Sequence, residues 1–320
     1  MPEQFCDVGG GITLCYETFG DASDPTALLI MGLGTQMIAW HVDFCEQLAA
    51  RGFHVVRFDN RDAGRSTHTD GPPPTPRQLL TRSRTAARYG LREMAADAAG
   101  LLGELDLAPA HVIGASMGGM IAQTLAARSP QLVSSLVSIM SNTGSRRSGQ
   151  PALGLYPIFL RRAPRERDAF IEHVARVFEA IGSRELTRDP EEIRALAAAS
   201  YERDRDPVGT GRQLAAIMAA GDRTGELRTI RAPTLVIHGS ADRLVGPSGG
   251  RATARAIPGA RLMMIPRMGH DLPRTVWPEI LDAIIENAEV ADSLRRHGAA
   301  SDTLRRPALQ ARPTASGLQG

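Results

Sequence analysis

Short apolar runs alternate with longer amphipathic stretches along most of the chain. The apolar runs include TALLIMG, HVVRFDN, HVIGAS, LVSSLVSIM and TLVIHGS, and several of them are apolar at consecutive positions. Consecutive apolar positions are typical of parallel strands in a sheet that helices cover on both faces. The stretches between the runs, such as AWHVDFCEQLAARG and MIAQTLAARS, carry apolar residues at helical spacing. The pattern therefore predicts an α/β domain with a mostly parallel sheet, and it favours an antiparallel pair of strands near the N-terminus.

The alternation is interrupted after the run SIMSNTGSRRSGQ. Residues 142–212 contain helical patterns such as RDAFIEHVARVFEAIG but no convincing strand, so we expect a helical cap insertion there. The insertion separates a first part of the core at residues 1–141 from a second part at residues 213–290. Residues 291–320 carry few large apolar side chains, and we expect a mobile tail in this region.

Composition and charge exclude some partners. The 37 basic and 35 acidic residues give a formal net charge of +2 and are spread along the 320 positions, which disfavours a nucleic-acid partner. No run approaches the roughly 18 apolar residues that a membrane span needs, and the start MPEQFCDVGG lacks the features of a signal sequence. Cys6, Cys15 and Cys45 form no C-x-x-C pair, which suits a reducing compartment. We therefore expect a cytoplasmic protein, and the sequence makes no prediction about its oligomeric state.

The run VIGASMGG places a serine between glycines where a strand is expected to turn into a helix. Ser116 is the centre of the pattern Gly114-x-Ser116-x-Gly118, which matches a nucleophile elbow. The small residues on either side avoid collisions in the sharp turn, and the turn lifts the hydroxyl clear of the sheet beside a helix N-terminus. The alternative is an ordinary turn in which Ser116 caps the following helix.

A base and an orienting acid decide between these alternatives, because a serine hydroxyl is a poor nucleophile without them. His270, in PRMGHDLP, directly follows the last expected strand, and Asp242, in VIHGSADRLV, follows the strand before it. Both side chains are therefore expected at the carboxyl edge of the sheet, close to Ser116. His238 and His111 lie within expected strands and are interpreted as structural. We predict that Ser116, Asp242 and His270 are the catalytic residues.

Two backbone amides are candidates for an oxyanion hole. The residue after the nucleophile, Met117, supplies one N–H donor in enzymes with this elbow. The run LLIMGLGTQMIAW ends the third expected strand in a glycine-rich loop, and the Leu33 N–H is the natural second donor. The alternative is that this loop is a simple glycine turn.

Five segments carry a family resemblance. MGLGTQMIAW, FDNRDAGRST, VIGASMGGMIAQTLAARSP, PTLVIHGSADRLV and RMGHDLP together resemble the α/β-hydrolase superfamily, and the second is similar to a loop of bacterial esterases of the aclacinomycin methylesterase type. The resemblance covers about residues 10–288. It implies an α/β-hydrolase fold, with a mostly parallel eight-stranded sheet, helices on both faces and a helical cap. Many members carry His-Gly at Met31-Gly32 and Arg-Gly at Arg61-Asp62, but neither difference removes a backbone donor.

The leading hypothesis is a serine hydrolase that cleaves a carboxylic ester with an apolar portion through an acyl-enzyme on Ser116. We predict no cofactor and no metal, because H-E-x-x-H, Walker and dinucleotide-binding patterns are absent from the sequence. Alternatives within the fold are a cofactor-free haloperoxidase or perhydrolase, and hydrolases of lactones, thioesters or carbon–carbon bonds. A ligand receptor that retains the triad is the alternative from another class.

Apolar residues near the expected site predict a pocket for a small-molecule ester. Met31, Met37 and Leu244 lie in loops at the sheet edge, and Leu155 and Phe159 lie in the apolar run ALGLYPIFLRRAP of the insertion. Core packing is the alternative role for each of them. Asp59, Arg61 and Asp62 form a charged loop that we interpret as a scaffold for the neighbouring oxyanion loop.

Overall fold

The computed structural model describes residues 2–75, 77–78, 87–155, 164–187, 189–204, 206 and 208–305, with side chains as far as 297. Eight strands form one sheet in the order β1-β2-β4-β3-β5-β6-β7-β8. The strands are β1 (Gln4–Asp7), β2 (Thr13–Phe19), β3 (Thr26–Ile30), β4 (His54–Phe58), β5 (Ala110–Ala115), β6 (Val133–Ile139), β7 (Thr234–Gly239) and β8 (Arg261–Ile265). β2 is antiparallel to both of its neighbours, β1 and β4, whereas β4, β3 and β5–β8 pair in parallel. The predicted α/β architecture and its antiparallel N-terminal pair are confirmed.

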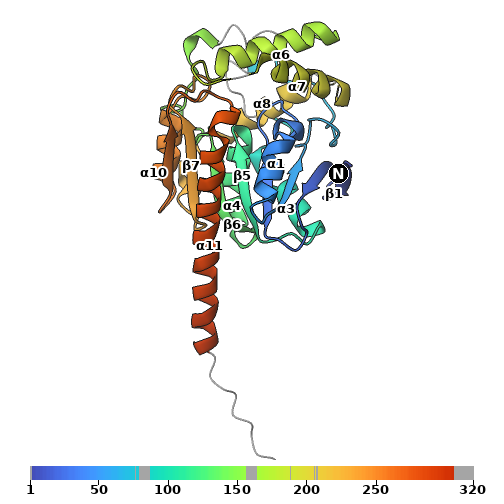
Figure 1. The fold of residues 1–320 in the computed structure, drawn as a ribbon. Helices are drawn as coiled ribbons and strands as arrows, with labels where there is room; N and C mark the ends of the chain where they lie inside the picture. The colour runs from blue at the N-terminus through green and yellow to red at the C-terminus, as the bar shows by residue number, and fades with distance from the viewer. Residues whose placement is uncertain are drawn as a thin grey trace, which may run out of the picture.

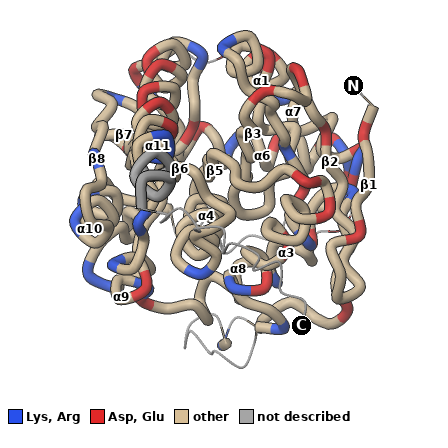
Figure 2. Tube along the Cα trace, turned by 90° about the horizontal axis from the view of Figure 1, so that it is seen from below, with Lys and Arg blue, Asp and Glu red and all other residues tan. Residues whose placement is uncertain are grey.

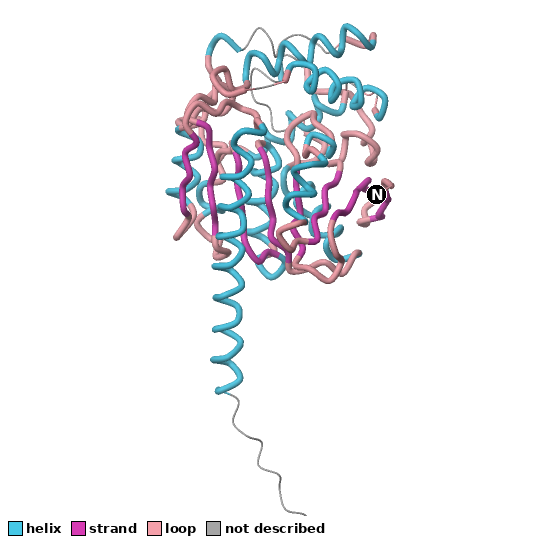
Figure 3. Tube along the Cα trace, in the orientation of Figure 1, coloured by secondary structure: helices cyan, strands magenta, loops and turns pink. Residues whose placement is uncertain are grey.

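Helices cover both faces of the sheet (Figure 1, Figure 3). The described α-helices are α1 (Val42–Ala49), α3 (Leu91–Glu104), α4 (Met117–Arg128), α6 (Arg167–Ile181), α7 (Pro190–Arg203), α8 (Gly209–Ala220), α9 (Thr224–Leu227), α10 (Ser248–Ala256) and α11 (Trp277–Arg305). On one face, the buried side chains of α3 and α4 pack with Leu28 and Ile30 of β3. On the other face, those of α1 and α11 pack with Ala27 and Leu29. This alternation follows from the two-residue period of a strand, so each buried strand serves two cores.

The region between β6 and β7 is helical in its described part. It contains α6, α7, α8 and α9, and no strand occurs among the residues of this region that the structure describes. Figure 1 shows α6 and α7 lying over one end of the sheet, with α8 between them and the strands. The expected boundary between residues 212 and 213 falls inside α8, because the apolar face of this helix continues through Leu214, Ile217 and Met218.

The C-terminal helix is longer than the sequence analysis expects. α11 continues to Arg305, 15 residues beyond the boundary at 290, and projects from the body of the molecule on the side away from α6 and α7 (Figure 1). Ala291 is buried, and the Arg295 guanidinium donates to Ser134 Oγ at 2.7 Å. The prediction of a mobile tail from residue 291 is therefore wrong for the start of that range, because this part of the helix packs against the core. Residues 306–320 lie outside the described residues.

Basic and acidic positions are interspersed over the described part of the chain (Figure 2). None of the helices in the described residues is both long enough and apolar enough to cross a membrane.

Candidate active site

Ser116 lies in a strained turn between β5 and α4. Its backbone has φ 57° and ψ −117°, a conformation that costs a residue with a Cβ atom about 1–3 kcal/mol. The surrounding backbone leaves no room for side chains at the flanking glycines. A Cβ atom at Gly114 would lie 2.2 Å from the Gly118 carbonyl oxygen, and one at Gly118 would lie 2.0 Å from the Ile30 carbonyl oxygen. The sequence therefore folds as a tight elbow that presents the Ser116 side chain at the end of the sheet.

A hydrogen-bond chain connects Ser116 to His270 and Asp242. Ser116 Oγ lies 2.9 Å from His270 Nε2, and His270 Nδ1 lies 2.8 Å from Asp242 Oδ2. Asp242 follows β7 and His270 follows β8, as the sequence analysis expects, and both side chains are buried. The structure thus brings together three residues from three separate loops.

The environment of Asp242 keeps its carboxylate ionised. Burial alone would raise its pKa, but attraction to His270 and hydrogen bonds from His238 and His270 outweigh burial and hold the pKa at about 2. The amides of Leu244 and Val245 also donate to Oδ1, each at 2.9 Å. An ionised Asp242 accepts the Nδ1 proton of His270, so Nε2 is left free to accept the proton of the Ser116 hydroxyl.

His238 lies next to Asp242 but away from the serine. Its side chain is fully buried, and Nε2 donates to the Val245 carbonyl at 2.7 Å and lies 3.4 Å from Asp242 Oδ2. This geometry supports the turn that carries Asp242. His111, at the start of β5, places Nδ1 2.9 Å from Ser135 Oγ, so it also contacts the core and not Ser116.

The two predicted oxyanion donors flank the serine. The loop after β3 passes close to the elbow, since a Cβ atom at Gly32 would lie 3.1 Å from Ser116 Cβ. Among the described residues, neither the Leu33 amide nor the Met117 amide has a hydrogen-bond acceptor. Met117 is also the first residue of α4, where the helix dipole favours negative charge. Both N–H groups are therefore available to an oxyanion formed at Ser116.

A cavity of about 1570 Å³ opens next to Ser116 and His270. Two of the predicted pocket residues, Met31 and Leu244, line it together with the two predicted oxyanion donors, Leu33 and Met117. Helices α6, α7 and α8 supply a large share of its apolar wall. Their apolar lining residues are Val177, Phe178, Ile181, Ile193, Ala195, Leu196, Ala199, Leu214, Ile217 and Met218.

Two predicted pocket residues do not line this cavity. The Met37 side chain is completely buried, because its backbone N–H is fixed to Asp59 Oδ1 at 2.7 Å in a 3-10 turn that directs the side chain into the interior. Leu155 is also buried and is absent from the cavity wall. Phe159 lies outside the described residues.

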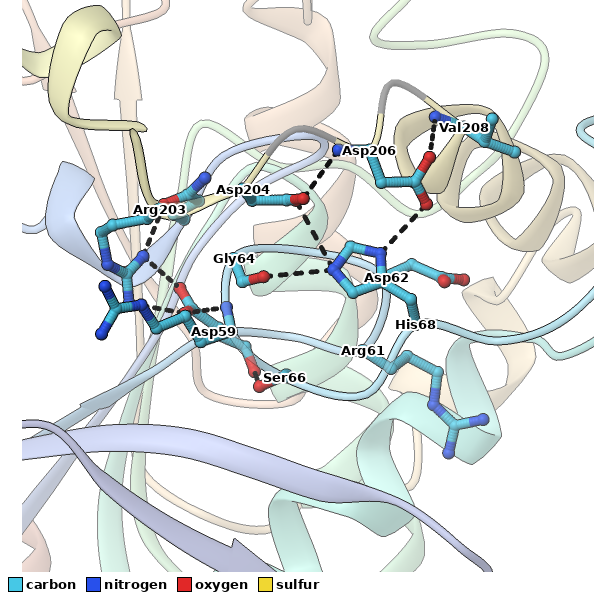
Figure 4. Close-up of polar contacts among 12 residues, drawn as sticks. Asp59, Arg61, Asp62, Gly64, Ser66, His68, Arg203, Asp204, Asp206 and Val208 are labelled. Carbon is cyan, nitrogen blue, oxygen red and sulfur yellow. Dashed lines mark hydrogen bonds and ion pairs between the residues drawn. The ribbon is translucent and has the colours of Figure 1, made fainter. Parts of the chain in front are cut away.

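The charged loop after β4 forms a buried network with the end of α7 (Figure 4). Asp59 is fully buried, accepts the amides of Met37 and Arg65, and pairs with the Arg203 guanidinium at 2.7 Å. Asp62 pairs with Arg212 of α8 at 2.7 Å. This geometry supports a scaffold role for the loop, as the sequence analysis interprets it.

The sequence alone does not reveal the partners that this network takes from the helical region. Arg203 ends α7 in the run YERDRD, which has the composition of a solvated helix end, and nothing local marks it as the partner of a buried carboxylate. The lining residues of α8 do carry a signal, because Leu214, Ile217 and Met218 recur at helical spacing. That apolar face could have been recognised as a cavity wall.

A family model described as alpha/beta hydrolase fold matches residues 25–273. The chain belongs to the α/β-hydrolase family. This α/β-hydrolase is 30% identical over 307 residues to rhodomycin D methylesterase DauP of Streptomyces sp. (strain C5), an alignment that covers 88% of this chain and 96% of the relative. It is 28% identical over 301 residues to rhodomycin D methylesterase DnrP of Streptomyces peucetius, with coverage of 88% and 96%.

Solved structures agree on the architecture of this α/β-hydrolase. The enol-lactonase from Burkholderia xenovorans LB400 superposes with a TM-score of 0.70 at 23% sequence identity, and the alignment covers 89% of this chain and 99% of that one. At this identity the likeness establishes the fold and not the substrate.

Proposed function

We propose that this α/β-hydrolase is a serine esterase whose catalytic triad is Ser116, His270 and Asp242. The observation that carries the proposal is the unbroken hydrogen-bond chain from Ser116 Oγ through both nitrogens of His270 to Asp242 Oδ2, with distances of 2.9 and 2.8 Å. The same constellation recurs on several unrelated folds that carry out acyl transfer through a serine nucleophile.

Acylation uses each group in one role. Ser116 Oγ attacks the ester carbonyl carbon while His270 Nε2 accepts the hydroxyl proton. The negative charge that develops on the carbonyl oxygen is stabilised by the N–H groups of Leu33 and Met117. Asp242 stabilises the positive imidazolium. When the tetrahedral intermediate collapses, the carbon–oxygen bond to the alcohol breaks and His270 returns the proton to that alcohol.

Deacylation repeats the steps with water. His270 Nε2 removes a proton from a water molecule as the water oxygen attacks the acyl carbon, and the same two amides stabilise the second oxyanion. Collapse of this intermediate releases the carboxylic acid and returns the proton to Ser116 Oγ. No redox change occurs in either half of the reaction.

The cavity favours a bulky apolar substrate. Its volume of about 1570 Å³ exceeds the roughly 300–1,000 Å³ of an ordinary ligand pocket. Two similar proteins are named rhodomycin D methylesterases, which supports a methyl ester as the bond that is cleaved. We therefore assign as substrate class the methyl esters of bulky, largely apolar carboxylic acids.

The helical region acts as a cap over this site. We assign the cap to residues 142–212 together with the remainder of α8, because α6, α7 and α8 all contribute apolar side chains to the cavity wall. An apolar cover excludes water from the reacting ester and strengthens the electrostatic interactions within the site.

A labelling and turnover experiment tests the proposal. A fluorophosphonate is expected to label Ser116 stoichiometrically, and methyl esters of acids with increasing numbers of fused rings are expected to be hydrolysed with rising kcat/KM. Assays with the matched lactones and thioesters, and an assay for peracid formed from an ester plus hydrogen peroxide, distinguish ester hydrolysis from the other reactions of this fold. Labelling at a residue other than Ser116, or labelling without turnover of any acyl substrate, contradicts the proposal, and the second outcome identifies a ligand receptor.

A further inference from the structure

Two loops of the site are held from outside by buried side chains of the cap. One loop carries His270 and the other carries Leu33. The contacts come from the segment after α6 and from α8, which lie over the end of the sheet in Figure 1. We infer that Ser183 and Gln213 are positioning residues of the reaction, and this inference rests on the proposed function.

Ser183 and its neighbours bind three consecutive residues of the histidine loop. The His270 amide donates to the Ile181 carbonyl at 2.9 Å, and the Gly269 amide donates to Ser183 Oγ at 2.8 Å. Asp271 Oδ1 in turn accepts the Ser183 amide at 2.8 Å and the Ser183 hydroxyl at 2.5 Å. The Ser183 side chain is completely buried, so these bonds are shielded from water.

The approach between these segments is very close. A Cβ atom at Gly269 would lie 2.4 Å from the carbonyl carbon of Gly182, so the cap backbone lies directly on the histidine loop. The backbone of His270 is thus fixed on the cap side, and its side chain is fixed on the core side by Asp242 at 2.8 Å. Fixing both ends sets the position of Nε2 relative to Ser116, which the proton transfer requires.

Gln213 holds the oxyanion loop in a comparable way. Its Oε1 atom accepts the Gly34 amide at 2.9 Å, and its Nε2 atom donates to the Arg61 carbonyl at 2.8 Å. The side chain is completely buried. Because Gly34 directly follows Leu33, the bond fixes the peptide plane next to the one that carries the Leu33 N–H group. Gln213 therefore links α8, the loop after β4 and the oxyanion loop.

These contacts give the cap a role beyond pocket lining. A lining residue contacts substrate in the ground state and the transition state alike, so its loss changes mainly KM. A positioning residue for the oxyanion donor or the general base acts on the transition state, so its loss changes mainly kcat. The two roles are separable on the same helix, because Ile217 of α8 lines the cavity whereas Gln213 contacts the loop.

The test compares Gln213→Met and Ser183→Ala with matched controls. Gln123→Leu is the control for the first variant, because Gln123 is equally buried but contacts Ser138 and Arg223 instead of the site loops. Ser135→Ala is the control for the second, because the buried Ser135 hydroxyl pairs with His111. Ile217→Ala reports the behaviour of a lining residue.

We expect Gln213→Met to lower kcat about tenfold while KM changes by less than twofold. We also expect the variant to bind a trifluoromethyl ketone inhibitor less tightly by a similar factor, because the adduct of this inhibitor carries an oxyanion. Gln213→Glu keeps an acceptor for the Gly34 amide but replaces the donor to the Arg61 carbonyl with an oxygen, so it is expected to restore only part of kcat. Ser183→Ala is expected to lower kcat about tenfold and to shift the acidic limb in the plot of kcat/KM against pH. Both controls are expected to lower the melting temperature without changing these quantities, and Ile217→Ala is expected to change mainly KM.

The rate of Ser116 labelling by a fluorophosphonate separates this inference from the proposed function. If the fluorophosphonate labels Ser116 in the wild type, and labels it equally fast in the folded Gln213→Met and Ser183→Ala variants, the inference is overturned and the proposed function stays intact. No labelling of Ser116 in the wild type overturns the proposed function instead. If Gln213→Met does not fold, amide hydrogen exchange of the wild type decides, because slow exchange of the Gly34 amide is expected and fast exchange overturns the role of Gln213.

Discussion

Ser116 Oγ lies 2.9 Å from His270 Nε2, although 154 residues separate the two positions in the chain. The two residues are held by different parts of the molecule, because distant segments hold the His270 loop whereas the elbow holds Ser116. The strained backbone of Ser116 is fixed by the β5–α4 turn, and its amide donates to the Ile139 carbonyl at 2.9 Å. The distance therefore depends on how the sheet and the cap hold the two loops together and is not set by either loop alone.

Ser116→Ala should remove essentially all ester hydrolysis, lowering kcat/KM by about 10⁴-fold or more, because the nucleophile is lost while binding is retained. Alanine meets the same backbone strain as serine, so we expect a nearly unchanged melting temperature. Stopped assays with a methyl ester and differential scanning calorimetry measure the two effects. Ser129→Ala, at the opposite end of α4, is the control and should retain full activity.

Asp242→Asn should lower kcat by about 10³- to 10⁴-fold, because a neutral amide no longer holds the Nδ1 proton on His270 and the tautomer needed at Nε2 is lost. The Asp242 pKa of about 2 means that its carboxylate stays ionised above about pH 4. Titration of Asp242 therefore should not set the acidic limb of the wild-type rate profile. The double variant Ser116→Ala with Asp242→Asn should be hardly less active than Ser116→Ala, and additive losses would argue against a triad.

The sequence is informative about the site where chemistry is tied to the ends of strands. Ser116, Asp242 and His270 each directly follow a recognisable apolar run, and parallel strands bring such positions to one edge of the sheet. The sheet and its antiparallel N-terminal pair follow from the same periodicity. These are local signals, so a single sequence is sufficient to read them.

Contacts between distant segments leave no such signal. Gln213 binds an amide 179 positions away, and Ser183 binds a carboxylate 88 positions away. Neither residue stands in a motif. The loop position of Met37 predicts a place in the pocket, but its orientation depends on a hydrogen bond to Asp59 that the local sequence does not specify. The continuation of α11 depends likewise on tertiary contacts such as the one between Arg295 and Ser134.

Leu196→Ala should change substrate preference and not the chemical step. Leu196 of α7 lines the cavity wall, and its truncation removes apolar contact from a bulky substrate, at a cost of about 1–3 kcal/mol in binding. We expect KM to rise about tenfold for a multi-ring methyl ester and to change less than twofold for methyl butyrate. The ratio of the two kcat/KM values measures the effect. An unchanged ratio in a folded variant would mean that α7 only covers the site.

His68 should make the anchoring of the cap pH-dependent. Its Nδ1 atom lies 3.1 Å from Asp206 Oδ2, and Nε2 lies 3.1 Å from the Gly64 carbonyl and 3.5 Å from Asp204 Oδ2 (Figure 4). Burial alone would lower the pKa of His68, but the Gly64 hydrogen bond and the two carboxylates outweigh burial and raise it. Arg212 also faces Asp206, at 3.0 Å. Both ring nitrogens thus face acceptors, which suits the protonated form.

A raised pKa means that the stabilisation is fully present below the ordinary histidine pKa of about 6.5 and is lost as pH rises through the folded-state value. The melting temperature of the wild type should therefore exceed that of His68→Gln by about 1–3 °C at pH 5.5, and the difference should shrink as pH rises. Scanning calorimetry at four pH values tests this. A difference that grows with pH would reverse the sign and contradict the assignment.

Arg203→Met should destabilise the protein by about 3–5 kcal/mol, because it leaves a buried carboxylate without its cation. Asp59 is fully buried, and its Oδ2 atom accepts both the Arg203 guanidinium at 2.7 Å and the Arg65 amide at 3.0 Å. The two backbone amides that Asp59 accepts cannot replace the lost charge. Asn in place of Asp59 has no charge to compensate, so the double variant Arg203→Met with Asp59→Asn should recover a large part of the loss. Urea unfolding of the wild type, both single variants and the double variant forms the cycle.

Arg167→Met is the control, because Arg167 pairs with Glu202 on the exposed surface of the cap and its loss should cost less than about 1 kcal/mol. If the losses of unfolding free energy in Arg203→Met and Asp59→Asn simply add up in the double variant, the pair does not anchor the cap.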